Sequence, residues 1–386
     1  MSPQNGTTGS APDHIDYDIH GLVGIRLLQP TAAEAAAVAR QLGPLRAPLQ
    51  RAPDLTIRFV DQLPTPGLRL LGLEKNGYTR DGFFILRSGK KRAKVRLDFA
   101  QIGGACEIVC ERGIAAVPLL LAIVNLTALQ KDCVALHASA FVYQETGIIV
   151  TGWAKGGKTE TLLAFAQHGA RYVGDEWILL RGDGREMYGV PENLRLWDWH
   201  LEHLPGLRRR VKREHRLRFK AIHALDRLQH KWPRGAGKFL PVKYLREAMP
   251  ALKRQLNVTL PAATIFGERC GPFSARPEKI FLVASHDLPQ TRVEQVAPQE
   301  IADRVIASIQ YELLPFMEHY LAFAFAFPER RNRFIEQATQ RQAEILRRAL
   351  AGLEAYAVWH PYPFSFEELY QRMKPFCEKS AAAVQQ

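Results

Sequence analysis

The sequence has few cysteines and no long hydrophobic run, and each shortage excludes a class of protein. Five cysteines are scattered over 386 residues, with no C-x-x-C pair and no Cys/His cluster at zinc-site spacing. We therefore expect reduced, mostly buried thiols. The longest apolar stretch, residues 114–129, is interrupted by Pro118 and Asn125 and is too short to cross a bilayer. We expect no membrane partner.

The N-terminal residues lack the basic segment followed by an apolar stretch that marks a secretory signal. Residues 1–12 are instead polar and rich in Gly, Ser and Thr. We expect a disordered tail over residues 1–14 and a cytoplasmic location.

Acidic residues are too few to balance the basic ones, which gives a net charge of +13. The excess is local, because residues 191–255 hold 17 Lys/Arg against 6 Asp/Glu and so carry +11 of it. Within them, residues 207–220 read L-R-R-R-V-K-R-E-H-R-L-R-F-K, with several aromatic residues nearby. One interpretation is a contact surface for a polyanion: RNA, an acidic peptide or a phosphorylated small substrate. The other is a solvated helical face whose arginines pair with acids of the same chain.

One motif carries specific chemistry. Residues 152–159 read G-W-A-K-G-G-K-T, a complete G-x-x-x-x-G-K-[ST] phosphate-binding loop, between a strand-like run at 147–151 and a helix-like run at 160–167. Glycines let the backbone N–H groups point at phosphate oxygens, and the following helix adds its N-terminal donors and dipole. Lys158 would reach the β- and γ-phosphates, and the Thr159 hydroxyl would ligate Mg²⁺. The residues predicted to contact the nucleotide are Gly152, Lys155, Gly156, Gly157, Lys158, Thr159 and Glu160.

Three further polar residues lie near this loop in sequence. Asp175 and Glu176 are adjacent at the end of one apolar run and the start of the next, where one acid would hold Mg²⁺ and the other accept a proton. Taken alone, they also fit a solvated strand-end pair. His137 lies in an apolar run, residues 134–140, where a buried histidine with one hydrogen bond is the alternative.

The order of apolar runs, turn signals and helical periodicity predicts an α/β protein. We expect an α+β region over residues 15–112, which serves as a platform, substrate shelf or oligomer contact. A nucleotide-binding core over 113–298 would follow, with a basic helical insertion at 191–255, and then a C-terminal helical region over 299–386. Residues 258–266 and 279–284 are predicted to return to the core as strands.

The spacing of these residues resembles that of a known enzyme family. His137 lies fifteen residues before Gly152, and Asp175 and Glu176 lie 23 and 24 residues after it. The block resembles the catalytic domain of the bacterial HPr kinase/phosphorylase family, which has a His-Gly start, a G-x-S-G-x-G-K-S-E-T loop, an R-G-H turn and a V-A-D-D strand end. The matching residues here are His137-Ala138, Gly152 to Thr161, His168-Gly169 and Val173 to Glu176.

The resemblance implies a phosphate-loop fold shared with phosphoenolpyruvate carboxykinases, with ATP and Mg²⁺ as cofactors. Lys158 would bind ATP phosphates and Thr159 the metal. Asp175 would take the proton of an acceptor hydroxyl, Glu176 would lie close to the metal, and His137 would be the active-site histidine.

The sequence also departs from this family. Glu176 replaces the family's second Asp, and Lys155 stands where the family usually has Gly. The R-G-x-G segment that engages HPr is not visible. The resemblance therefore predicts an ATP-dependent kinase for a hydroxyl of a peptide or protein serine, or of a small molecule, other than HPr. The sequence leaves open whether the chain forms a homo-oligomer.

The sequence leaves two alternative functions open. One is a nucleotide-dependent regulator that binds RNA or another polyanion and has little or no transfer activity. The second is a carboxykinase-like metabolic enzyme, which is weaker because the sequence shows no set of metal-binding histidines or arginines for a small carboxylic acid.

Overall fold

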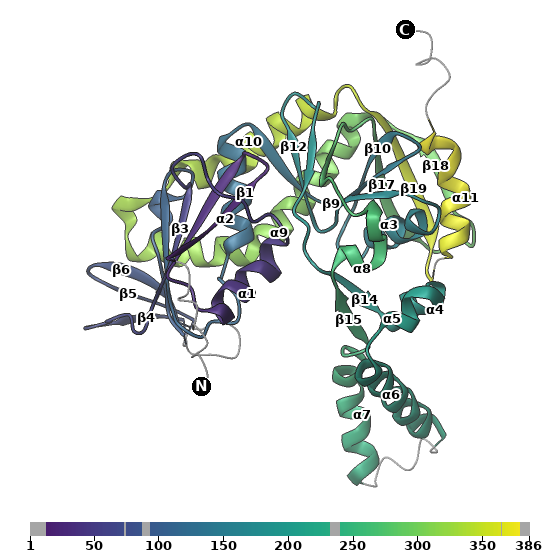
Figure 1. Cartoon of the computed structure of the whole chain (residues 1–386), viewed down its shortest axis with the longest axis horizontal. Helices are drawn as coiled ribbons and strands as arrows, with labels where there is room; N and C mark the ends of the chain where they lie inside the picture. The colour runs from purple at the N-terminus through teal and green to yellow at the C-terminus, as the bar shows by residue number, and fades with distance from the viewer. Residues whose placement is uncertain (1–12, 73–74, 87–92, 232–239, 364, 379–386) are drawn as a thin grey trace, which may run out of the picture. The chain divides into compact units, whose positions relative to one another are not determined.

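A computed structural model of the chain describes residues 13–72, 75–86, 93–231, 240–363 and 365–378. They divide into two compact units, described in turn below. The main unit comprises Met1–Glu192 and Arg269–Gln386, and the inserted unit comprises Asn193–Glu268. Helices combine with mixed sheets, so the predicted α/β class is confirmed (Figure 1). Most of the predicted tail lies outside the described residues, and β1 already begins at His14.

The N-terminal part of the main unit is an eight-stranded mixed sheet in the order β1-β2-β3-β8-β7-β6-β5-β4. Its helix α1 (Ala32–Leu42) begins with the capping box of Thr31 and Glu34 that the sequence contains. The strands are β1 (His14–Ile19), β2 (Val23–Leu28), β3 (Leu55–Val60), β4 (Arg69–Leu71), β5 (Asn76–Thr79), β6 (Gly82–Ile85), β7 (Val95–Leu97) and β8 (Cys106–Glu111).

The second sheet of the main unit, the core sheet, has the order β16-β13-β12-β9-β10-β17-β19-β18, and β11 also pairs with β9. Strands β10, β17 and β19 run parallel, and residues of β9 and β10 are almost all buried, as expected for strands covered on both faces. The strands are β9 (Cys133–Tyr143), β10 (Thr146–Thr151), β11 (Arg171–Gly174), β12 (Trp177–Arg181), β13 (Met187–Gly189), β16 (Ser274–Ala275), β17 (Lys279–His286), β18 (Arg292–Gln295) and β19 (Glu354–Pro361).

Five further helices complete the main unit: α2 (Leu120–Gln130), α3 (Lys158–Gln167), α9 (Pro298–Ala326), α10 (Arg333–Leu350) and α11 (Phe366–Cys377). Helix α9 packs against α10 and contacts strands of both sheets, β5 and β6 of the first and β9 and β19 of the core sheet (Figure 1). The chain after residue 298 therefore supplies helices and also β19, a strand inside the core sheet. One continuous apolar core runs through both sheets.

The inserted unit consists of a two-stranded antiparallel sheet and several helices. Its elements are β14 (Leu194–Trp197), α4 (Asp198–His203), α5 (Pro205–Arg210), α6 (Arg213–Lys231), α7 (Leu240–Lys253), β15 (Asn257–Leu260) and α8 (Ala262–Phe266). The prediction that residues 258–266 return to the core as a strand is wrong. Residues 257–260 pair with β14, and 262–266 are helical, because a short apolar run specifies neither element by itself.

Among the described residues, no helix has the length and apolar character needed to span a membrane. The predicted core strand at 279–284 is confirmed, since β17 lies between β10 and β19.

Candidate active site

The predicted phosphate loop connects β10 to α3, and its glycines are dictated by close packing. A Cβ at Gly152 would lie 2.3 Å from the Val283 carbonyl oxygen. At Gly156 it would lie 3.0 Å from the Trp153 carbonyl oxygen, and at Gly157, which has φ +108°, 2.7 Å from His360 Nε2. A larger residue therefore requires backbone atoms to shift at Gly152 and Gly156, and the His360 ring to move at Gly157.

Substitution of Gly157 by alanine is expected to destabilise the fold by about 1–3 kcal/mol, because it adds a clash with His360 to a strained φ. Chemical denaturation measures the free energy of unfolding. Gly352→Ala is the control, since its Cβ would meet nothing within 4 Å and its φ is not in the left-handed region. Equal stability of the two variants would show that the loop is not packed as described.

Lys155 adopts the left-handed backbone conformation, with φ +63°. A residue with a Cβ pays about 1–2 kcal/mol there, whereas glycine pays little. The Lys155 side chain is exposed on the loop surface.

Lys158 is the first residue of α3 and is almost buried, with 6% exposure. Its ammonium donates to the carbonyl oxygens of Gly152 at 3.3 Å and Trp153 at 3.0 Å. Burial lowers the pKa of Lys158, and the carboxylates of Glu176 and Asp175 oppose this effect. The ammonium is thus held on the loop backbone.

Thr159 and Asp175 are in direct contact. The Thr159 hydroxyl donates to Asp175 Oδ2 at 3.0 Å, and Asp175, which follows β11, is 4% exposed. Burial, followed by the charge of Glu176, raises the pKa of Asp175 well above its usual value; the Thr159 hydrogen bond and Lys158 oppose the shift. A raised pKa makes the carboxylate a stronger base than an ordinary aspartate.

Glu176 and His137 form a second contact beside the first. Glu176 has φ +69° and a side chain that is 52% exposed, with Oε2 3.2 Å from His137 Nε2. His137 pairs with Trp177 in the β9–β12 ladder, which places it next to Glu176. Its other ring nitrogen, Nδ1, lies 3.0 Å from Glu312 Oε1 of α9. His137 is therefore flanked by two carboxylates.

Glu160 lies in the first turn of α3, where a negative charge is favourable to the helix dipole. Its charge also acts on Lys158 and Asp175. The structure thus brings together all three of the predicted residues outside the loop, His137, Asp175 and Glu176, with Lys158 and Thr159 of the loop.

Three residues in or beside this site escaped sequence reasoning. Glu312 faces His137, His360 Nε2 lies 2.8 Å from the Gly156 carbonyl oxygen, and Glu192 lies close enough to Glu176 to feel its charge. The sequence carries no signal for Glu312 or His360, which lie more than 130 residues beyond the positions they contact. Glu192 is nearer but belongs to no motif.

Glu192 has a buried carboxyl oxygen, Oε1, that has no hydrogen-bond partner within the described part of the chain. Burial, followed by the charge of Glu176, raises the pKa of Glu192 to about 8. The folded protein therefore holds this carboxyl group in its neutral form at neutral pH.

Glu192→Gln is expected to stabilise the protein increasingly as the pH rises. Above pH 4.5 the unfolded chain releases this proton, whereas the folded chain keeps it up to about pH 8. The free energy of unfolding of the wild type therefore falls relative to the variant across this window, by at most about 1.4 kcal/mol per pH unit. Denaturation curves from pH 4.5 to 8 test this, with the exposed Glu329→Gln as control. A difference independent of pH would contradict the assignment.

The predicted metal ligands were Thr159, Asp175 and Glu176. Across the described residues, no group of three or more His, Cys, Asp and Glu side chains is arranged to hold a metal ion. Mg²⁺ in nucleotide sites uses only one or two carboxylates together with phosphate oxygens and water. The site fits this requirement, because the Thr159 hydroxyl contacts the Asp175 carboxylate and Glu176 is the next residue in the sequence.

Comparison with protein-family models gives no match for this chain, and no curated protein matches it.

Proposed function

We propose that the protein is an ATP- and Mg²⁺-dependent kinase that transfers the γ-phosphate to a hydroxyl group. The acceptor is a peptide or protein serine, or a small molecule. The proposal depends on one observation: the Thr159 hydroxyl contacts the buried Asp175 carboxylate. Thr159 directly follows Lys158 at the start of α3. This contact joins a phosphate-binding loop to a candidate proton acceptor.

The loop supports the nucleotide part of the proposal. Gly152, Gly156 and Gly157 keep side chains out of the space around the loop backbone. Helix α3 has no side-chain cap at its N-terminus, so its first N–H groups stay available to an anion. Lys158 adds a positive charge at the same end of the helix.

The number of carboxylates at the site supports a requirement for Mg²⁺. Asp175, Glu176, Glu160 and Glu312 all act on Lys158, and this concentration of carboxylates would repel ATP alone. Mg²⁺, when bound, would neutralise phosphate charge. Thr159, Asp175 and Glu176 are the residues that would hold it.

The proposed chemistry is an in-line displacement. The acceptor oxygen attacks the γ-phosphorus, the bond from that phosphorus to the β,γ-bridging oxygen breaks, and ADP leaves. The acceptor's proton passes to Asp175. Lys158 stabilises charge on the phosphate oxygens, and His137, held between Glu176 and Glu312, positions Glu176.

Trp153 offers a direct binding signal. It lies in the loop, is 52% exposed and packs against Tyr311 with ring centroids 4.8 Å apart and ring planes tilted by 37°. Addition of ATP with Mg²⁺ is expected to change its fluorescence saturably, and ATP without Mg²⁺ to bind at least several-fold more weakly. A Trp153→Phe variant assigns the signal. Absence of any saturable binding, confirmed by calorimetry, would remove the basis of the proposal.

A second candidate is a nucleotide-dependent regulator that binds RNA or another polyanion without transferring phosphate. The charge of the inserted unit favours it. The presence of Lys158, Thr159 and Asp175 in one contacting set favours the kinase, because pure nucleotide sensing does not need a buried proton acceptor.

A further inference from the structure

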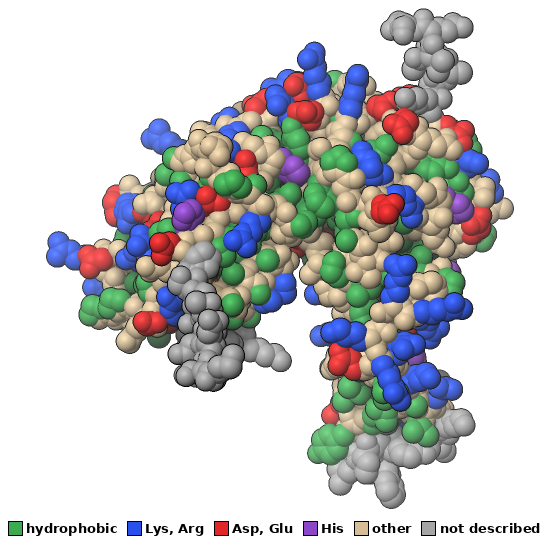
Figure 2. Space-filling model, viewed as in Figure 1, with side chains coloured by type: hydrophobic (Ala, Val, Ile, Leu, Met, Phe, Trp, Pro, Cys, Tyr) green, Lys and Arg blue, Asp and Glu red, His purple; other side chains and the backbone are tan. Residues whose placement is uncertain are grey.

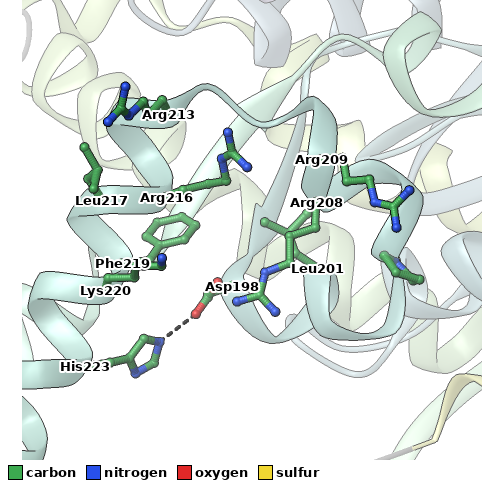
Figure 3. A pocket seen from close by; sticks show the side chains of 11 residues that line it. Asp198, Leu201, Arg208, Arg209, Arg213, Arg216, Leu217, Phe219, Lys220 and His223 are labelled. Atoms are coloured by element: carbon green, nitrogen blue, oxygen red, sulfur yellow. Dashed lines mark hydrogen bonds and ion pairs between the residues drawn. The ribbon is translucent and has the colours of Figure 1, made fainter.

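The inserted unit contains a pocket that the proposed kinase chemistry does not use. It lies between α5 and α6, has a volume of about 640 Å³ and is within the size range of small-molecule sites (Figure 3). Apolar side chains, including Leu201, Pro205 and Leu217, form part of its wall.

Five cations line this pocket: Arg208, Arg209, Arg213, Arg216 and Lys220. None of their side chains has a hydrogen-bond or ion-pair partner within the part of the chain that the structure describes. In Figure 3, Arg208 from α5 and Arg216 from α6 point toward the space between the helices. Figure 2 shows Lys and Arg gathered over the same helices. Unpaired like charges at this density favour an anionic ligand, and guanidinium groups match phosphate geometry.

Neighbouring arginines of the same segment behave differently. Arg210 donates to the Thr264 carbonyl oxygen at 2.9 Å, and Arg218 donates to that of Asn257 at 2.8 Å. The segment therefore divides its arginines between fold-stabilising bonds and a set that faces the pocket. Arg210 and Arg218 therefore bond to carbonyl oxygens, and not to the acids that one sequence-based interpretation expected.

Asp198 is the one acid that lines the pocket, and it is 5% exposed. Its Oδ2 lies 2.6 Å from His223 Nε2, whereas its buried Oδ1 has no hydrogen-bond partner among the described residues. A buried carboxylate oxygen without a donor is costly, so the site calls for a ligand that brings one. A hydroxyl group on the ligand supplies it, whereas inorganic phosphate held through its oxygens by the arginines has no separate hydroxyl group to offer.

A single-stranded nucleic acid fits the pocket less well. Such ligands stack their bases on exposed aromatic side chains. Phe219, the aromatic residue of the lining, is 4% exposed, so its ring is covered by protein. The limited volume of the pocket and its buried acceptor, Asp198 Oδ1, instead favour a compact ligand.

We propose that this pocket binds a small phosphate monoester that carries a free hydroxyl group, such as a sugar or polyol phosphate. Arg208 and Arg216 hold the phosphate, and Asp198 Oδ1 accepts the hydroxyl proton in a hydrogen bond. The proposal goes beyond the kinase function and does not depend on it.

Calorimetric titration of the full chain at low salt tests this. The probes are the phosphate monoesters of glycerol, ribose and glucose, inorganic phosphate, unphosphorylated ribose and a single-stranded RNA oligomer. At least one ester is expected to bind ten-fold or more tightly than inorganic phosphate, and ribose is expected not to bind. Because phosphates also fit the loop of the main unit, each titration is repeated in Lys158→Ala, where binding to the pocket should persist.

Substitutions in the lining of the pocket test which residues bind the ester. Arg208→Gln with Arg216→Gln should weaken ester binding by at least ten-fold, while Arg254→Gln, an exposed arginine outside the lining, should leave it unchanged. Asp198→Asn should reduce the affinity for the ester to that for inorganic phosphate. The proposal is wrong if no ester exceeds inorganic phosphate, if binding disappears in Lys158→Ala, or if RNA binds more tightly than every ester. Circular dichroism confirms that each variant is folded.

Discussion

Lys158→Ala is expected to weaken ATP binding by roughly 10- to 150-fold, the equivalent of about 1.5–3 kcal/mol for a hydrogen bond to a charged group. Lys158 is the buried cation at the start of α3, and burial lowers its pKa. Phosphate oxygens of a bound nucleotide would replace the loop carbonyl oxygens as acceptors for the Lys158 ammonium group. Calorimetry with Mg²⁺ present measures the change in Kd.

The matched control is Lys155→Ala in the same loop. Lys155 is exposed, so its removal should change ATP affinity by no more than a few-fold. Lys158→Ala should remain folded, because it removes a buried charge and leaves the glycines in place. Unchanged affinity in Lys158→Ala would contradict the assignment of this loop to phosphate binding.

Asp175→Asn is expected to reduce the rate of phosphoryl transfer at saturating ATP and Mg²⁺ by about 10²- to 10⁴-fold. Asparagine keeps the shape and still accepts the Thr159 hydrogen bond, but it cannot take a proton. In the wild type the rate should rise with pH as Asp175 loses its proton, and this limb of the pH profile should vanish in the variant. Asp183→Asn, in the turn between β12 and β13, is the control.

The stability of Asp175→Asn separates lost chemistry from lost structure. Because the folded pKa of Asp175 lies above its unfolded value, the wild type loses stability as the pH rises past about 3.8. The amide removes this penalty, so the variant should unfold at a higher Tm than the wild type at neutral pH. An inactive variant that is also less stable would indicate a structural role instead.

Much of the site followed from sequence because its parts are close together along the chain. The loop, α3 and the acids at 175 and 176 lie within one strand–helix–strand segment, and β9 joins them through direct pairing with β10 and β12. Short connections leave few possible arrangements. The structure places Thr159 beside Asp175 and His137 beside Glu176.

The remaining parts depend on packing between distant segments. Glu312 reaches His137 because α9 packs on β9, and His360 reaches the loop because β19 lies beside β17. Helical periodicity identifies α9 but does not tell which of its polar residues faces His137. The prediction that residues 258–266 return to the core sheet was wrong for a related reason, because β15 pairs with β14 of the inserted unit.

The most direct test of the account is transfer from ATP labelled at the γ-phosphate into a lysate fractionated by size, with products identified by mass spectrometry. Wild type, Asp175→Asn and Asp183→Asn are compared with Mg²⁺ and with chelator. The account predicts a labelled phosphate ester on a hydroxyl group that forms with wild type and Asp183→Asn, requires Mg²⁺ and is lost with Asp175→Asn. Saturable ATP binding with no labelled product in any fraction, or equal labelling by Asp175→Asn, would contradict it.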